Sequence, residues 1–173
     1  MSENFLLDVP SCISKFHVFQ SEHVESKSIG FFLQCAHCKS QDFIILCYPI
    51  VAEDDETFEG VSAGQIVERS PHHLQCSGCN RRELLFDPEI HGYDGALGHG
   101  SSYECGNVNE RPITSVSSVY KTKVEFFYSI EFDELAEIAK DSNTRPQDLF
   151  DGIAIHAVNS DGVIIKTLGY ECA

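Results

Sequence analysis

Two Cys-x-x-Cys pairs are the part of this sequence whose residue types and spacing are best suited to chemistry. The frames "LQCAHC" and "LQCSGC" place them at Cys35, Cys38, Cys76 and Cys79. Thiolates are favoured ligands of Zn²⁺, which takes four ligands in a tetrahedron. A Cys-x-x-Cys turn presents two sulfurs on one side, so two such turns complete the shell. The sequence therefore predicts one structural Zn²⁺ held by these four cysteines.

Other uses of paired cysteines fit the sequence less well. Thioredoxin-type redox chemistry needs a Cys-x-x-Cys that opens a helix after a βαβ pattern, and neither pair precedes a helix pattern. A catalytic zinc keeps one position open for water or substrate, whereas four thiolates fill the shell. His72 and His73 lie close to the second pair, but four cysteines already satisfy the metal. The pattern therefore favours a closed structural site over a reactive one.

The residues around the pairs resemble a known kind of metal site. Each pair follows one apolar strand pattern and precedes another, as in rubredoxin-type knuckles. The residue after the second cysteine of such a knuckle turns sharply, which suits Asn80 and suits Lys39 less well. Residues 29–87 are similar to zinc-ribbon proteins with a large insertion, and more loosely to the β-tent families, in which two distant knuckles pin two antiparallel sheets. The resemblance implies a structural zinc and no activity.

Short apolar runs of β type recur along the chain and are expected to position the knuckles. The expected strands are 29–33, 43–48, 64–68, 74–75, 83–86, 119–127 and 162–168. The first two are expected to flank the first pair as the arms of a hairpin. Residues 132–140 carry apolar side chains at helical spacing, and 144–150 predict a shorter helical turn. We therefore expect an α+β fold: predominantly antiparallel β hairpins around a zinc-knuckle site, with one helix of the C-terminal half packed on the sheet.

A length of 173 residues fits a single domain, 1–173, in which a weak internal similarity predicts two halves. The first half, 24–90, bears the zinc. In the second, 100–173, "CGNVNERP" from Cys105 aligns with "CSGCNRRE", and His156 falls where Cys35 stands in the first half. We interpret the second half as a degenerate knuckle unit plus the helix, with Cys105 and His156 as remnants of a second metal site. The alternative is coincidence.

The charge of the chain bears on its partners. Twelve Lys and Arg against 27 Asp and Glu give a formal net charge of −15, which repels nucleic acid and membrane surfaces and favours a basic protein. A zinc-ribbon protein associated with nucleic acid is an alternative that requires the cations to share one face. Those cations are Arg69, Arg81, Arg82, Lys121 and Lys123.

The termini and the cysteine content bear on the compartment. The N-terminus lacks a positive region before its apolar run, and no apolar stretch is long enough to span a membrane. Eight cysteines in such a chain indicate a reducing compartment, in which paired thiols bind metals more often than they form disulfides. We expect a cytoplasmic protein.

The sequence favours binding over catalysis. We expect a non-enzymatic protein-binding module, for example an adaptor or a bacterial immunity protein that neutralises a basic partner; the sequence identifies neither the partner nor the oligomeric state. The alternative is an enzyme that uses the glycine-rich segment 87–112, in which His91, Asp94 and His99 lie close together. Phosphate-binding, Ser/His/Asp and metalloprotease signatures are absent from the sequence, so we name no catalytic residues.

Overall fold

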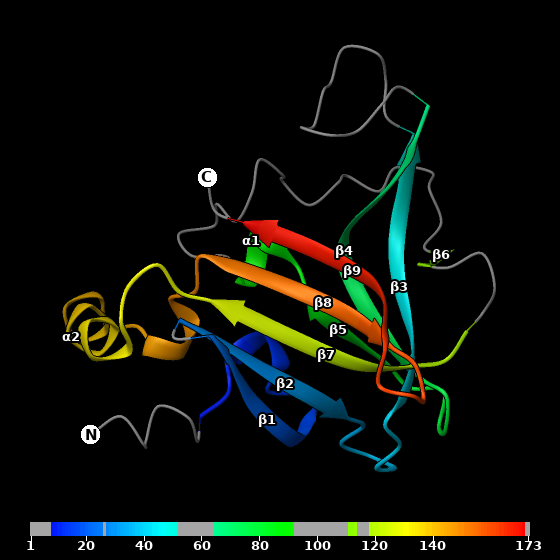
Figure 1. Cartoon of the computed structure of the whole chain (residues 1–173), viewed down its shortest axis with the longest axis horizontal. Helices are drawn as coiled ribbons and strands as arrows, with labels where there is room; N and C mark the ends of the chain where they lie inside the picture. The colour runs from blue at the N-terminus through cyan, green and yellow to red at the C-terminus, as the bar shows by residue number, and fades with distance from the viewer. Residues whose placement is uncertain (1–7, 26, 52–63, 92–110, 114–117, 172–173) are drawn as a thin grey trace.

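The computed structural model describes residues 8–25, 27–51, 64–91, 111–113 and 118–171 (Figure 1). Nine strands in this part of the chain form one antiparallel sheet. The strands are β1 (His17–Glu25), β2 (Ser28–Gln34), β3 (Asp42–Val51), β4 (Ile66–Cys76), β5 (Arg82–Phe86), β6 (Arg111–Pro112), β7 (Tyr120–Phe127), β8 (Gly152–Val158) and β9 (Ile164–Glu171). The helical elements are η2 (Ser11–Ile13), α1 (Pro88–His91), α2 (Phe132–Ser142) and η4 (Pro146–Asp148).

The fold is nearly all-β, so the expected α+β class is wrong. Half of the structure is strand, and the single sheet curls into a half-barrel. Helix α2 forms where the spacing predicts it, but it has only 11 residues and lies beyond the ends of β7 and β8 instead of covering the sheet (Figure 1). Its Leu135 and Ala139 reach the edge of the core. Helical periodicity predicts that a helix exists, but it does not predict where the helix packs or how much of the sheet it covers.

Strand β7 organises the sheet, because three different strands pair with it. One edge of β7 pairs with β8 from Lys121 to Phe127. The other edge pairs first with β3, through Lys121 and Asp42, and then with β2, from Lys123 opposite Phe32 to Phe127 opposite Ser28. Strands β2 and β3 therefore lie end to end along β7, and the first cysteine pair leaves the sheet between them. They are not the two arms of a hairpin, because a strand distant in sequence satisfies their backbone groups.

The sheet divides at this break into two wings. On one side β1 pairs with β2, and on the other β4 and β5 continue outward from β3. In Figure 1, β3 and β4 run steeply across the direction of β7, β8 and β9. The first cysteine pair therefore lies where the two wings part.

Alternation along the strands directs large apolar side chains into the curled sheet. Phe31, Phe126 and Phe150 are almost fully buried, and the ring of Phe126 lies 6.0 Å from that of Phe31 and 4.9 Å from that of Phe150. Burial of one such side chain stabilises the fold by roughly 2 to 3 kcal/mol. The same core includes Cys35 and Cys76, so the cysteine cluster is an extension of the hydrophobic core.

Candidate metal centre

Pairing between β3 and β4 brings the two cysteine pairs together. Strand β3 begins just after the first pair, and β4 ends at the second, so that Phe43 lies opposite Cys76. The backbone N–H and the hydroxyl of Ser77 both donate to the carbonyl oxygen of Asp42, each at 3.0 Å. Antiparallel register alone therefore places the second pair beside the first.

Both pairs adopt the same tight turn. In the first, the N–H of Cys35 donates to the carbonyl of Ser40 at 2.8 Å, and the N–H of Lys39 donates to the carbonyl of Cys35 at 3.0 Å. The second turn repeats these bonds at 2.8 and 2.9 Å. The residue after each pair has left-handed backbone, with φ of 64° at Lys39 and 58° at Asn80. This is the knuckle conformation that the sequence predicts.

The four sulfur atoms form a compact cluster that suits a metal ion. The Sγ atoms of Cys35, Cys38, Cys76 and Cys79 all lie within 4.8 Å of one another. The closest contacts join opposite knuckles, 3.7 Å from Cys35 to Cys79 and 3.4 Å from Cys38 to Cys76. A tetrahedron with Zn–S bonds of about 2.3 Å has sulfurs about 3.8 Å apart, whereas a disulfide bond is about 2.05 Å long. The donor set and its spacing fit a tetrahedral thiolate site.

The local electrostatics of the cluster also favour a cation. Burial raises the pKa of Cys35, but hydrogen bonds from the backbone amides of Cys38 and His37 outweigh burial and lower it to about 7. The amide of Ser40 lowers the pKa of Cys38, but the neighbouring thiol of Cys76, desolvation and the other two thiols together raise it to about 12. One thiolate thus opposes ionisation of the next. The positive charge of a bound dication offsets this repulsion, so that each coordinated thiol loses its proton.

The two arginines that follow the second knuckle, Arg81 and Arg82, have separate positions. Arg81 follows the second knuckle and lines a cavity that Cys35 also borders. A guanidinium nitrogen of Arg82 lies 3.3 Å from Nδ1 of His73. Arg81 is therefore the arginine beside the metal centre.

No protein-family model, curated protein or solved structure matches the chain. Among the described residues, no helix has the length and apolar character needed to cross a membrane. The function must therefore be inferred from the geometry of the chain itself.

The histidines that the sequence singles out do not join the cysteine cluster. His72 is fully buried in β4, where burial lowers its pKa to about 4. His91 ends α1, and its Nδ1 lies 3.1 Å from the backbone nitrogen of Asp87, so it accepts a bond from that N–H. Burial lowers the pKa of His91 as well. Asp94 and His99, its partners in the predicted enzymatic site, lie outside the described residues.

The second knuckle pair predicted from internal similarity can be followed only in part. His156 lies within strand β8, opposite Thr167, and its Nδ1 is 2.9 Å from the Thr167 hydroxyl oxygen. The following turn is closed by the N–H of Gly162, which donates to the carbonyl of Asn159 at 3.1 Å. Cys105 lies outside the described residues, so the two-half organisation stays a prediction.

Sequence reasoning missed a buried ionic cluster on the outer face of β7. Lys123 Nζ lies 2.5 Å from a carboxylate oxygen of Glu22 and 3.7 Å from one of Glu125, and Nε2 of His156 lies 3.4 Å from the same Glu125 oxygen. Gly30 makes room for this arrangement, since a Cβ there would lie 2.5 Å from Cε of Lys123. The alternating Lys and Glu of β7 are the only sequence feature that points to this cluster, and the same alternation is equally typical of an exposed strand. Lys123 is consequently withdrawn from any basic surface.

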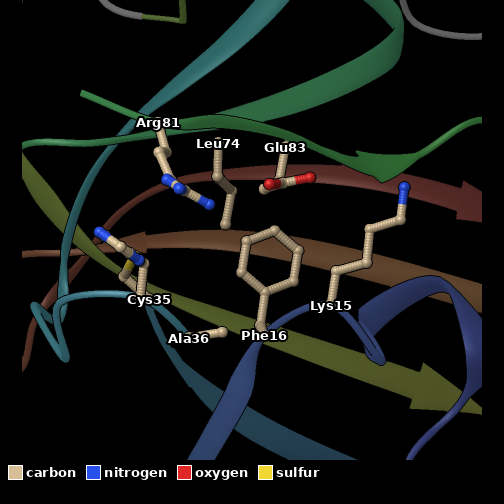
Figure 2. A pocket seen from close by; sticks show the side chains of 8 residues that line it. Lys15, Phe16, Cys35, Ala36, Leu74, Arg81 and Glu83 are labelled. Carbon is tan, nitrogen blue, oxygen red and sulfur yellow. The ribbon is translucent and has the colours of Figure 1, made fainter. Parts of the chain in front are cut away.

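Sequence reasoning also missed a cavity of about 210 Å³ beside the first knuckle (Figure 2). Its walls come from the segment before β1, from the knuckle and from the β4–β5 hairpin. The lining residues are Lys15, Phe16, Cys35, Ala36, His37, Leu74, Arg81 and Glu83. No local pattern predicts this convergence, because the three segments meet only through the fold.

Proposed function

We propose that the chain binds one structural Zn²⁺ through Cys35, Cys38, Cys76 and Cys79. The observation that carries the proposal is the set of four sulfurs within 4.8 Å, contributed by two knuckles with the same hydrogen-bond pattern. Four thiolates leave no coordination position for substrate, so the zinc stabilises the fold and does not act on a substrate. Its role is to join the two wings of the sheet where they part. The thiols must stay reduced, which suits the cytoplasm.

We further propose that the zinc-stabilised fold is a protein-binding module for a basic partner. Support comes from the net charge of −15 and from an exposed apolar tip, consisting of Val163, Ile164 and Ile165. These side chains are 55, 48 and 49% exposed. Ile164 lies opposite Val158 at the end of β8, and a register shift separates this pair from Lys166 opposite Ala157. In the described part of the chain β9 pairs only with β8, and a free edge of this kind accepts an added strand.

The metal part of the proposal is tested by native mass spectrometry and elemental analysis of protein purified without added metal. One zinc per chain and four thiols protected from alkylation are the expected result. Two metals per chain would instead indicate a further site, and oxidised pairs without metal would contradict the proposal.

The binding part is tested with a photo-crosslinking residue at Val163 and identification of the attached protein. We expect a basic protein whose capture declines at high salt, because screening weakens exposed charge interactions. Ile165→Lys should remove the capture, since it places a cation at the contact with a basic partner. Ile90→Lys is the matched control, because Ile90 is 66% exposed on α1, outside the apolar tip. Equal capture by both variants would show that the apolar tip is not the binding surface.

Neither alternative has comparable support. The enzyme alternative rests on His91, Asp94 and His99, of which only His91 belongs to the described residues. A nucleic-acid site loses Lys123, which is buried against Glu22. Protein binding is therefore the function that the geometry supports best.

A further inference from the structure

The cavity beside the first knuckle has an apolar floor and a charged rim. Phe16 and Leu74 are 7% and 1% exposed, and Figure 2 shows them pointing toward each other across the cavity. Lys15 and Arg81 lie on opposite sides of the view, with Glu83 between them. The cavity thus offers two cations, one carboxylate and an apolar wall within a single small space.

The charged groups on the rim take no part in ion pairs within the described part of the chain. Lys15, Arg81 and Glu83 form no ion pair with any residue in the described ranges. Two cations at one mouth also stand out in a chain with only 12 Lys and Arg against 27 Asp and Glu. A carboxylate is repelled by most of this surface and attracted here.

The walls of the cavity are held in place by interactions outside it. Ser11 donates from its N–H and its hydroxyl to the two carboxylate oxygens of Asp148, each at 2.6 Å, which anchors the segment that carries Lys15 and Phe16. The ring of Phe16 packs edge-on against Phe43 at 6.0 Å. A preformed site of this kind loses little entropy when it binds a small ligand.

The size of the cavity limits the ligand to an apolar group the size of one amino-acid side chain, with a small polar head group. A cavity of about 150 Å³ suffices for benzene, and drug-sized ligands need roughly 300 Å³ or more. A volume of about 210 Å³ lies between these limits. The ligand must also present an anion to Arg81 and a donor to Glu83.

We propose that this cavity binds an apolar α-amino acid. Its carboxylate contacts Arg81, its nitrogen donates to Glu83, and its side chain packs between Phe16 and Leu74. The same chemistry is present in a free amino acid and in the C-terminal residue of a peptide. The proposal goes beyond the protein-binding function above, and failure of either leaves the other standing.

The first test is a titration of the zinc-loaded full-length protein by calorimetry, with L-phenylalanine, N-acetyl-L-phenylalanine and L-phenylalaninamide as probes. We expect saturable binding of an acid with a dissociation constant between about 10 μM and 1 mM. The amide should bind at least about tenfold more weakly, because it lacks the carboxylate. Binding of the free amino acid alone assigns the site to a metabolite, and equal or tighter binding of the acetyl derivative assigns it to a peptide C-terminus. No saturable binding, or equal binding of the amide, would overturn the proposal.

The second test compares two adjacent arginines that differ in their relation to the cavity. Arg81→Gln should weaken binding of the acid about tenfold or more, whereas Arg82→Gln should leave it unchanged, because Arg82 lies beside His73 outside the cavity. Zinc content is measured for both variants. If Arg81→Gln lowers zinc retention and leaves the affinity for the acid unchanged, Arg81 serves the metal centre alone and the assignment is wrong.

Discussion

At the scale of single residues, the cysteine cluster is the feature with the largest expected effect on stability. Cys35 and Cys76 are both buried and belong to the main core, while Cys38 is exposed and Cys79 is half-buried. Loss of one ligand therefore opens the metal shell and weakens the core at the same point. A structural zinc contributes free energy of folding directly, since the unfolded chain does not hold the site together.

We predict that Cys76→Ser lowers the free energy of unfolding by more than about 3 kcal/mol, because metal binding of this type is worth roughly 10 kcal/mol or more. The check is urea unfolding with and without a chelator. An excess of chelator should bring the wild-type protein down to the level of the variant. Cys12→Ala is the control, since it removes a buried thiol outside the cluster and should respond to chelator as the wild type does. A metal-free Cys76→Ser protein of wild-type stability would show that the site is not structural.

Lys39 carries a backbone cost that glycine would avoid. Its φ of 64° lies in the left-handed region, which costs a residue with a Cβ roughly 1 kcal/mol. We predict that Lys39→Gly raises the free energy of unfolding by about 0.5 kcal/mol. Ala36→Gly in the same turn is the control, and it should lower stability because Ala36 has no left-handed backbone to relieve. The measurement is thermal unfolding of both variants. Destabilisation by Lys39→Gly would contradict the prediction.

At the scale of elements, the two knuckles depend on a close approach between them. A Cβ at Gly78 would lie 3.1 Å from Sγ of Cys38 and 3.2 Å from Cβ of Ser40, both in the opposite knuckle. Neither neighbour is the end of a long flexible side chain, so an added methyl group requires the facing knuckle to shift by a few tenths of an ångström. Small-to-large changes in tight contacts typically cost about 1 to 3 kcal/mol.

Gly78→Ala should therefore release zinc about tenfold faster or more. The measurement is the rate of zinc transfer to a chromophoric chelator. Gly169→Ala is the matched control, because a Cβ there would meet nothing within 4 Å. Identical transfer rates for the wild type and Gly78→Ala would mean that the knuckles tolerate separation.

At the scale of the whole molecule, buried neutral histidines make the fold sensitive to acid. Burial lowers the pKa of His72 from 6.5 to about 4, with a smaller lowering by His73 and opposing contributions from a backbone bond to Leu46 and from Asp87. Burial lowers the pKa of His156 too, against the opposing charge of Glu125. A histidine whose pKa is lowered in the folded state stays neutral there. Its contribution to the stability of the fold is therefore complete above about pH 6.5. That contribution is lost as the pH falls toward the folded pKa.

For His72 the loss between about pH 6.5 and 4 should reach roughly 3 kcal/mol. The experiment is urea unfolding across this range for the wild type and His72→Gln, which cannot titrate. Zinc loss in acid affects both proteins alike, so it cancels from the difference between their pH profiles. We expect a shallower decline for the variant. Parallel profiles would show that His72 does not couple stability to pH.

The sequence alone determined the local parts of this protein. The spacing of the cysteines specified the four clustered sulfurs, and Asn80 indicated the left-handed turn after the second pair, because both depend on a few neighbouring residues. Apolar runs likewise predicted most strands and helix α2. Strand β1 was missed because its polar residues resemble a loop. Strand β8 was missed because it is buried throughout and has no alternation to recognise.

Only the tertiary structure decided how these parts combine. The end-to-end placement of β2 and β3 on β7 follows from pairing between residues about 80 to 100 positions apart, which no local period encodes. The ionic cluster around Lys123 and the cavity beside Cys35 depend on the same long-range pairing, because each gathers side chains from segments distant in sequence. Local spacing thus specified the candidate metal ligands, and the curvature of the whole sheet placed the surfaces at which we propose binding.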